Sequence, residues 1–437
     1  MSSLKKSFGA LGGATLLSLA AYKWGLPLPQ ASALFVILLM AFWWVLNALP
    51  YYVTATLPAL SVPFLSFMGL KDAALLWNAY AQPIIGLFLG SFWIAKAVEN
   101  HGLADYFQQR VLRWTKGSHQ RLLLGFMILA AGFSTLLNNT SVAALILPIT
   151  SRLPLPNENK WRLGLGIAWA SSIGGVITLT GSAPNGIIAQ LLEAQGHPIS
   201  YLTWLKFGAP AGLGMLGLAY IVLRSPSGFV SLEANKSVRL TPSAHWTLIV
   251  LLCTIGGWLF LPLPSWNVAL LGGVSLFILR AQGKPLLSFQ EGRRIPWEVL
   301  WLFGGSLALA KLLELSGLSA RLVEWAYPLL SHTSPCLFLW AAIGIPLWLT
   351  ELLSNTALVA LSAPLLLPLL QKVSLPPESL IFTGIATSAA FMLPVATPPN
   401  ALACSIGGVP FEVMRRYGFW LNCLALGWIA GLACLLI

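Results

Sequence analysis

The residues best suited to chemistry are uncharged polar residues within a sequence that is otherwise nearly all apolar. They form a short pattern, here called a cassette, that occurs twice. The first cassette is Asn138-Asn139-Thr140 with a later Gly181–Asn185, and the second is Ser354-Asn355-Thr356 with a later Ala396–Asn400. Equivalent asparagines lie 215 or 216 positions apart. Two similar halves, each with polar residues and helix breakers in a hydrophobic stretch, are typical of repeat-built secondary transporters, which bind their substrate where the halves meet.

The chemistry open to these residues is the binding of an anion and of hard cations. Unpaired Asn, Ser and Thr are costly in hydrocarbon, so both cassettes are expected to face an interior site. The start of an interrupted helix offers amide hydrogens to an anion, while carbonyl and Asn oxygens suit sodium. No Arg, Lys or His adjoins either cassette, so a doubly charged anion needs bound cations, or an exchange cycle in which the site never crosses empty.

The repeat also extends upstream of the cassettes. Seven residues of the first half recur exactly 215 positions later; the first-half members are Gly90, Ser91, Ala95, Lys96, Glu99, Gly102 and Leu103. The pairs Lys96 with Glu99 and Lys311 with Glu314 lie three apart on one helical face and are expected to be local ion pairs. The repeat therefore covers the helices around the cassettes as well as the cassettes themselves.

The composition is that of an integral membrane protein. Of the 437 residues, 57% are hydrophobic and 9% charged, and the mean hydropathy is +0.79. A spanning helix needs roughly 20 apolar residues, and the chain offers about eleven such stretches, so no large aqueous domain is expected. Most of the 25 Lys and Arg residues behind the +12 net charge lie in gaps between apolar stretches. This distribution sets topology by the positive-inside rule and argues against a nucleic-acid partner.

The elements that must position the cassettes are predicted to be all helical. In the first half we expect spans at about 8–25, 31–49, 51–70, 79–99 and 203–223, a basic amphipathic stretch at 103–117, a re-entrant helical hairpin at 119–150 and a broken span at 161–195. Gly174-Gly175 and Gly181–Pro184 are expected to unwind that span. In the second half we expect spans at about 244–262, 266–280, 296–315 and 417–437, a hairpin at 335–370 and a broken span at 377–408. The amino terminus could be a cleaved signal peptide, but a first span is favoured.

The predicted organisation is two repeats of opposite orientation. The first covers 1–223, with scaffold helices at 1–118 and the hairpin and broken helix at 119–195, and a cytoplasmic linker follows at 224–243. The second covers 244–437, with scaffold helices at 244–334 and the hairpin and broken helix at 335–408. With a cytoplasmic amino terminus, six crossings and then five place the carboxyl terminus outside, so the hairpins enter from opposite sides as an inverted repeat. The expected location is a bacterial inner membrane.

Nothing in the sequence predicts enzyme chemistry. The five cysteines and five histidines are scattered, and no metalloprotease, nucleophile-elbow, CxxC or P-loop pattern occurs. We expect Cys253, Cys336, Cys404, Cys423 and Cys434 to be small core residues and not disulfides or metal ligands. Glu351, beside the second cassette, could relay protons or tune a cation site, or could be a partnered structural carboxylate.

The sequence resembles the divalent anion:sodium symporter family, which includes sodium-coupled dicarboxylate and citrate carriers. The resemblance rests on the paired tips and loops, on Phe391–Asn400 (FMLPVATPPN) and on Leu302–Leu318 (LFGGSLALAKLLELSGL). It implies a homodimer in which a transport domain of hairpins and broken helices moves as an elevator against a scaffold. Substrate carboxylates would then meet Asn138, Asn139, Thr140, Ser182, Ser354, Asn355, Thr356, Thr397 and Pro398. Sodium would meet one set made of Ser134, Asn138, Asn139 and Gly181, and another made of Thr350, Leu353, Asn355 and Ala396.

The first cassette departs from the family pattern. Asn138 stands where the family has Ser, Ala183 where Pro is usual, and Asn47 replaces a common acidic residue. The function expected from the sequence is sodium-coupled transport of a C4 dicarboxylate such as succinate or malate. Sodium-independent exchange of di- or tricarboxylates, or transport of sulfate-like oxyanions, are the alternatives. Apart from the substrate, sodium and the lipid bilayer, a second copy of the chain is the expected partner; no cofactor is expected.

Overall fold

The structure, a computed structural model, describes residues 3–224, 228–230, 239–330 and 333–437, and these residues are almost entirely helical. Their one regular sheet is a small hairpin of β1 (Arg280–Ala281) and β2 (Lys284–Pro285). The helices of the first half are α1 (Ser3–Lys23), α2 (Leu28–Val45), α3 (Tyr51–Thr54), α4 (Leu57–Leu60), α5 (Val62–Phe67), η1 (Ala73–Ala81), α6 (Pro83–Asn100), α7 (Leu103–Thr115), α8 (His119–Ser134), α9 (Asn139–Ile146), α10 (Ile149–Arg152), α11 (Asn157–Ile177), α12 (Ala183–Ala194) and α13 (Tyr201–Leu223). Those of the second half are α14 (Pro242–Phe260), α15 (Ser265–Ile278), α16 (Phe289–Gly292), α17 (Trp297–Leu315), α18 (Leu318–Leu330), α19 (Pro335–Leu349), α20 (Asn355–Lys372), η2 (Pro377–Ser379), α21 (Leu380–Ala386), α22 (Pro398–Ser405) and α23 (Phe411–Leu436).

Several helices are long and apolar enough to cross a membrane. By length and composition, five segments of the described residues qualify, and a sixth does if the bent pair formed by Phe289–Leu315 and Leu318–Ala326 counts as one span. The five are Leu28–Val45, Ala73–Asn100, Tyr201–Leu223, Pro242–Phe260 and Phe411–Leu436. This is fewer than the eleven spans expected, in part because the spans expected at 51–70 and 377–408 are divided into shorter helices.

The prediction of one span at 51–70 is wrong. The chain there forms the three short helices α3, α4 and α5. Pro58 and Pro63 each lie in the first turn of a new helix. A proline has no amide hydrogen to bond the carbonyl of the preceding turn, so each one ends the helix before it. The segment is apolar, but the spacing of its prolines prevents a continuous helix.

Both broken helices occur where the sequence predicts them, although one reason given for the first break is wrong. α11 ends at Ile177 and α12 begins at Ala183, while α21 ends at Ala386 and α22 begins at Pro398. Gly174 lies inside α11, where a Cβ atom would come within 2.2 Å of the Ala131 carbonyl oxygen of α8. This glycine therefore permits close packing of α8 on α11, and the unwinding starts only at Thr178.

The helices before each hairpin pack against the opposite half of the chain. α6 packs on α15, and its sequence equivalent α17 packs on η1, α3 and α4. A Cβ atom at Gly90 of α6 would come within 2.2 Å of the Ala269 carbonyl oxygen, and one at Gly305 of α17 within 2.4 Å of the Ala55 carbonyl oxygen. Equivalent glycines thus make equivalent backbone contacts across the two halves, so the halves pack closely at both places.

We expect Gly90→Ala and Gly305→Ala each to destabilise the protein by about 1–3 kcal/mol, because the atoms that the added Cβ meets include backbone, which cannot rotate away. The measurement is the melting temperature of the detergent-purified protein. Gly256→Ala is the matched control: no atom lies within 4 Å of the added Cβ, and alanine favours the helix by about 0.5–1 kcal/mol. Melting temperatures of the two variants at or above that of Gly256→Ala would contradict the tight cross-half packing.

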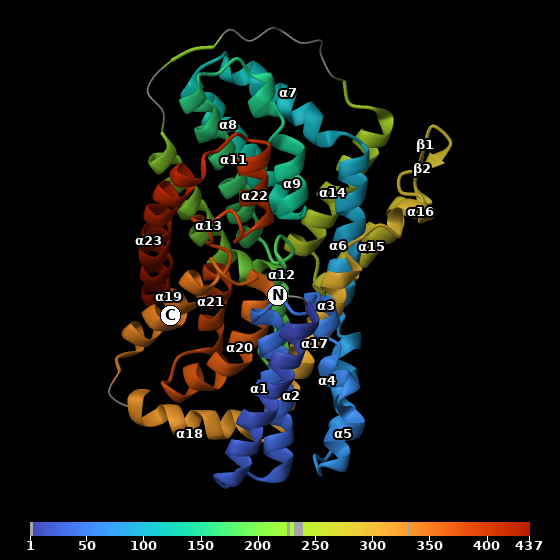
Figure 1. Cartoon of the computed structure of the whole chain (residues 1–437). Helices are drawn as coiled ribbons and strands as arrows, with labels where there is room; N and C mark the ends of the chain where they lie inside the picture. Colours follow the sequence, from blue (N-terminus) through green and yellow to red (C-terminus); the bar gives the residue numbers. More distant parts are fainter. Residues whose placement is uncertain (1–2, 225–227, 231–238, 331–332) are drawn as a thin grey trace.

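Equivalent elements of the halves lie at opposite ends of the molecule. In Figure 1, α7 lies at the top and its sequence equivalent α18 at the bottom. The short helices α9 and α22 lie between them in the upper half of the view, and α12 lies near its middle. These cassette helices therefore lie between the two amphipathic helices.

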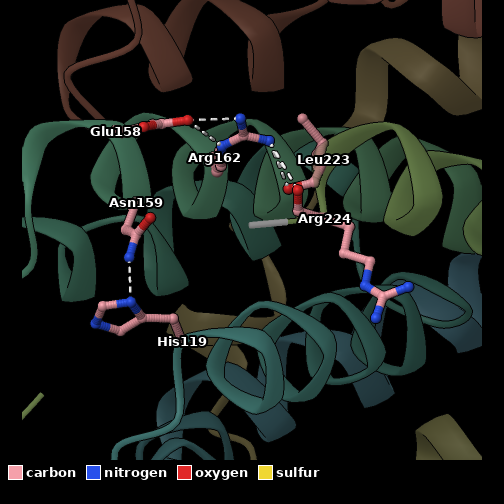
Figure 2. A network of polar contacts seen from close by, with 6 residues as sticks. All are labelled: His119, Glu158, Asn159, Arg162, Leu223 and Arg224. Carbon is pink, nitrogen blue, oxygen red and sulfur yellow. Dashed lines mark hydrogen bonds and ion pairs between the residues drawn. The ribbon is translucent and has the colours of Figure 1, made fainter. Parts of the chain in front are cut away.

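A polar network ties the start of the first hairpin to α11 and α13 (Figure 2). Arg162 donates to the carbonyl oxygens of Leu223 and Arg224 at 3.1 and 3.0 Å and pairs with Glu158 at 2.7 Å. The guanidinium thus satisfies carbonyls at the carboxyl end of α13, where a cation is favourable. Asn159 of α11 is hydrogen-bonded to His119 of α8 in the same view. Most of the predicted linker at 224–243 lies outside the described residues.

The prediction that the five cysteines are core residues without a disulfide is wrong. Cys336, at the start of α19, and Cys434, at the end of α23, form a disulfide with their Cα atoms 5.6 Å apart. Cys253 is free and exposed, and Cys404 and Cys423 are free and partly buried, so none of the five is a fully buried core residue. The disulfide joins the first arm of the second hairpin to the last helix. The sequence could not indicate this pairing because 98 positions separate the two residues.

Candidate functional site

Both cassettes line a single cavity of about 410 Å³ near the middle of the molecule. This is a usual volume for a small-molecule site. All nine residues predicted to bind the substrate line it: Asn138, Asn139, Thr140, Ser182, Ser354, Asn355, Thr356, Thr397 and Pro398. The structure therefore brings together residues that lie more than 200 positions apart in the sequence.

Four helices begin at this cavity. The first residues of α9, α12, α20 and α22 are Asn139, Ala183, Asn355 and Pro398, and all four line it. Each helix start carries a partial positive charge, and the starts of α9, α12 and α20 also offer amide hydrogens; α22 begins with Pro398 and Pro399, which have none. Among the described residues that line the cavity, none is Lys, Arg or His. Its positive potential therefore comes from helix ends and neutral donors, an arrangement that suits an anion.

At the first hairpin tip, oxygen atoms gather around the amide group of Asn139. One terminal amide atom of Asn139 lies 2.6 Å from Ser134 Oγ and 3.3 Å from the carbonyl oxygens of Ser171 and Gly181. If the nitrogen occupies this position, it donates to all three; if the oxygen occupies it, four oxygens converge. Converging neutral oxygens are the ligands that a hard cation needs. Ser134 and Gly181, both predicted from the sequence, are thus close to Asn139.

The second hairpin tip has the equivalent arrangement. The Thr350 hydroxyl lies 2.7 Å from Asn355 Oδ1 and 2.8 Å from the Thr387 carbonyl oxygen. Thr350 is completely buried, as is Ser134 in the first half. Of the other residues predicted for the sodium sites, Leu353 and Ala396 line the cavity. Neither Ser171 nor Thr387 was predicted, because backbone carbonyls leave no signal in side-chain identity.

A buried asparagine holds each helix break open. Asn185 Nδ2 donates to the carbonyl oxygens of Gly175 and Thr178, both at 2.8 Å. Asn400 Nδ2 donates to the carbonyl oxygens of Ala390 and Leu393, at 2.9 and 3.0 Å. Both asparagines are completely buried. The final Asn of each cassette loop is therefore a clamp on the broken helix, and not a ligand of the cavity, which neither residue lines.

Part of the cavity wall was missed by the sequence analysis. The residues that complete it from elements before the hairpins are Asn47, Tyr51, Phe88, Phe92 and Val299. Asn47 was noted only as a departure from the family pattern; the other four are aromatic or apolar, and nothing in their type or spacing separates them from ordinary packing residues. They form the wall that faces the two cassettes.

A second cavity of about 450 Å³ adjoins the first, and cationic side chains line it. The two cavities share Phe92, Asn138 and Thr140, and Lys96 and Arg294 line the second one. Lys96 is paired with Glu99 at 3.1 Å, and its equivalent Lys311 with Glu314 at 3.0 Å, which confirms the two predicted local ion pairs. Cationic side chains thus line a cavity beside the first tip without entering the central cavity.

Comparisons with known proteins identify similar transporters. A citrate transporter family model matches residues 41–383. The sodium-dependent dicarboxylate transporter SdcS of Staphylococcus saprophyticus is 30% identical over 90% of this chain and 83% of its own length, and that of Staphylococcus aureus is 30% identical over 92% and 84%. The crystal structure of the Alcanivorax borkumensis YdaH transporter has a TM-score of 0.58 at 14% identity, covering 82% of this chain and 86% of that one, so the two share a fold.

Proposed function

This chain belongs to the citrate transporter family, among the divalent anion:sodium symporters, and from that membership we propose that it carries a C4 dicarboxylate such as succinate or malate together with sodium. Members of this family are transporters and not enzymes. The observation that carries the proposal is the single cavity at which both cassettes and four helix starts meet. Two relatives named as sodium-dependent dicarboxylate transporters support the ion and the substrate class.

The substrate carboxylates are proposed to bind the donors of the cavity. The hydroxyls of Thr140, Ser182, Ser354 and Thr356 are short, directional donors, and the amide hydrogens at the starts of α9, α12 and α20 supply the rest. None of them carries a full charge, so the site is compatible with a dianion only when other charges offset it. Sodium ions at the two hairpin tips supply that offset.

The two sodium ions are proposed to bind beside Asn139 and Asn355. Ser134, Asn138, Asn139 and Gly181 hold the first ion, with the Ser171 carbonyl as a further ligand. Thr350, Leu353, Asn355 and Ala396 hold the second, with the Thr387 carbonyl added. The gathered oxygens at each tip support this assignment. Each asparagine lines the cavity as well, so one amide contacts both the ion and the anion.

The transport cycle is proposed to be an elevator movement of inverted repeats in a homodimer. The opposite positions of α7 and α18 support the inversion (Figure 1). The hairpins with α11, α12, α21 and α22 form the moving unit, and the wall containing Asn47 and Tyr51 belongs to the scaffold that it slides past. In this arrangement the amino terminus is cytoplasmic and the carboxyl terminus external.

Uptake into proteoliposomes tests the proposed function. Purified protein reconstituted into vesicles should accumulate labelled succinate or malate when a sodium gradient points inward, and should not do so with potassium in its place. Uptake that is independent of sodium and requires an anion preloaded in the lumen would instead identify an exchanger. Uptake of sulfate in place of every carboxylate tested would identify an oxyanion carrier.

The disulfide provides a test of the proposed orientation. Cys336 and Cys434 lie at the ends of α19 and α23, on the side proposed to be external. Disulfides persist outside the cytoplasm and are reduced within it. We therefore expect mass spectrometry of protein alkylated without reductant to find Cys336 and Cys434 cross-linked, while Cys253, which is free and exposed, is alkylated. Alkylation of Cys336 and Cys434 to the extent seen for Cys253 would contradict this orientation.

A further inference from the structure

Glu351 is a buried carboxylate directly beside the second cation site. Its side chain is 2% exposed, and it follows Thr350 in the sequence. Oε1 accepts from the Met392 amide at 2.9 Å and from Asn422 Nδ2 at 2.6 Å, and Oε2 accepts from the Leu393 amide at 2.9 Å. All three partners are donors, which matches an ionised carboxylate, since that group only accepts.

This charge has no cationic partner in the described part of the chain. None of the salt bridges among the described residues includes Glu351. Asn422 of α23 is completely buried, and its Oδ1 accepts from the Phe391 amide at 3.3 Å. A buried charge without an opposite charge is costly, and hydrogen bonds from neutral groups offset only part of that cost. A cation bound nearby would offset much of the rest.

The first half joins the same two segments without a charge. The equivalent of Glu351 is Thr135, 216 positions earlier, and its carbonyl oxygen accepts a hydrogen bond from the Thr178 hydroxyl. The second half joins its hairpin tip to the unwound segment through Glu351 and the Leu393 amide. The two cation sites are therefore alike in oxygen ligands and unlike in charge.

We propose that Glu351 is a positioning residue that makes the second cation site, at Thr350 and Asn355, the tighter of the two sodium sites, and that this site fills first. Consecutive Cα atoms are about 3.8 Å apart, so the carboxylate lies within about 10 Å of an ion at Thr350. At an effective dielectric constant of about 20, a unit charge at that distance changes cation affinity roughly tenfold. Asn422 supports the carboxylate, so α23 contributes to the site without lining the cavity.

This inference rests on the proposed sodium coupling, and sodium binding alone tests it. The melting temperature of the full-length purified protein is followed while sodium chloride replaces potassium chloride at constant ionic strength, with no carboxylate present. Ligand binding to the folded state raises the melting temperature, so the titration midpoint reports sodium affinity. Wild type should be stabilised by sodium; a wild type that sodium does not stabilise would contradict the sodium coupling itself.

Three variants separate charge from packing. Glu351→Gln should raise the sodium midpoint roughly tenfold, because the charge is lost while the shape is kept. Asn422→Ala removes two hydrogen bonds, one to Glu351 and one from the Phe391 amide, and keeps the charge, so it should lower the melting temperature in potassium and leave the midpoint unchanged. Glu412→Gln, at an exposed acid that pairs with Arg415, should change neither. If sodium stabilises the wild type but Glu351→Gln keeps the wild-type midpoint, Glu351 is only structural and the inference is overturned.

A second comparison decides the matter even if Glu351→Gln does not fold. Thr350→Ala and Ser134→Ala each remove one hydroxyl from a cation site, the second and the first respectively. If the second site is the tighter one, Thr350→Ala should raise the sodium midpoint of the first ion bound, and Ser134→Ala should leave it unchanged. Equal shifts, or a larger shift for Ser134→Ala, would overturn the proposed order.

Discussion

Asn355→Ala should abolish sodium-driven dicarboxylate uptake, and Asn139→Ala should do the same. Each asparagine lines the central cavity and also contacts the hydroxyl of a proposed sodium ligand, 2.6 Å away for Asn139 and 2.7 Å for Asn355. Alanine removes an oxygen from the cation site and a donor from the anion site at once. A site built to hydrogen-bond its ligand discriminates by a factor of about 10⁴ or more against a complex in which one polar partner is missing. We therefore expect initial uptake rates at least 100-fold below wild type. The measurement is the initial rate in proteoliposomes with equal amounts of reconstituted protein.

The control for this loss is an asparagine outside the site. Asn78 is exposed in η1 and lines neither cavity, so Asn78→Ala should transport at the wild-type rate. Size-exclusion profiles and melting temperatures in potassium establish that Asn139→Ala and Asn355→Ala are folded. Transport by both folded variants at rates within a few-fold of Asn78→Ala would contradict the site assignment.

The two helix breaks could be predicted from the sequence because their signal is local. A Pro-Asn or Pro-Pro-Asn loop and a run of small polar residues interrupt an apolar stretch wherever they occur, so the breaks after Ile177 and Ala386 follow from nearby residues. The internal repeat then supplied what one motif could not, since two matched copies are expected to meet at one site. The single cavity lined by Asn139 and Asn355 agrees with that expectation.

Contacts between distant segments were not predictable from one sequence. The carbonyl partners of Asn400, the donors around Glu351 and the pairing of Cys336 with Cys434 all join segments whose proximity is set by the tertiary fold. For Glu351 the sequence left a proton relay, a cation site and a structural role open. Its three donors now favour a fixed charge, because a carboxylate that accepts from every partner needs no proton to complete its bonding.

The segment at 51–70 shows a different limit. Its composition is as apolar as that of a span, but Pro58 and Pro63 divide it into short helices. Average hydropathy does not register such interruptions, whereas proline spacing does. Tyr51, at the start of α3, lines the cavity, so this irregular segment helps to shape the site. The spacing of these prolines predicts irregular backbone in this segment. Within a membrane, such backbone is tolerated only where it is buried in protein or lines a cavity.

Asn400→Ala and Asn185→Ala should each destabilise the protein by about 2–4 kcal/mol and also weaken substrate binding. Each substitution leaves two buried carbonyl oxygens without a donor, at about 1–3 kcal/mol apiece, while removing a side-chain oxygen that has no partner among the described residues. The Gly175 carbonyl belongs to the last turn of α11, and the Thr178, Ala390 and Leu393 carbonyls belong to the unwound segments, so these segments can rearrange and move Ser182 or Thr397 away from the cavity.

The two asparagine clamps are distinguished from ligands by what their loss changes. We expect a lower melting temperature in potassium, where neither sodium nor substrate is bound, and this is the readout that a residue acting only as a ligand would leave unchanged. Asn78→Ala again serves as the exposed control. If Asn400→Ala melts like Asn78→Ala in potassium yet fails to bind a dicarboxylate, the residue contacts the substrate directly and its assignment as a clamp is wrong. If Asn400→Ala melts at a lower temperature than Asn78→Ala, the hydrogen bonds of Asn400 hold the break in the helix. Weaker substrate binding by the same variant then shows that affinity depends on a side chain that does not line the cavity.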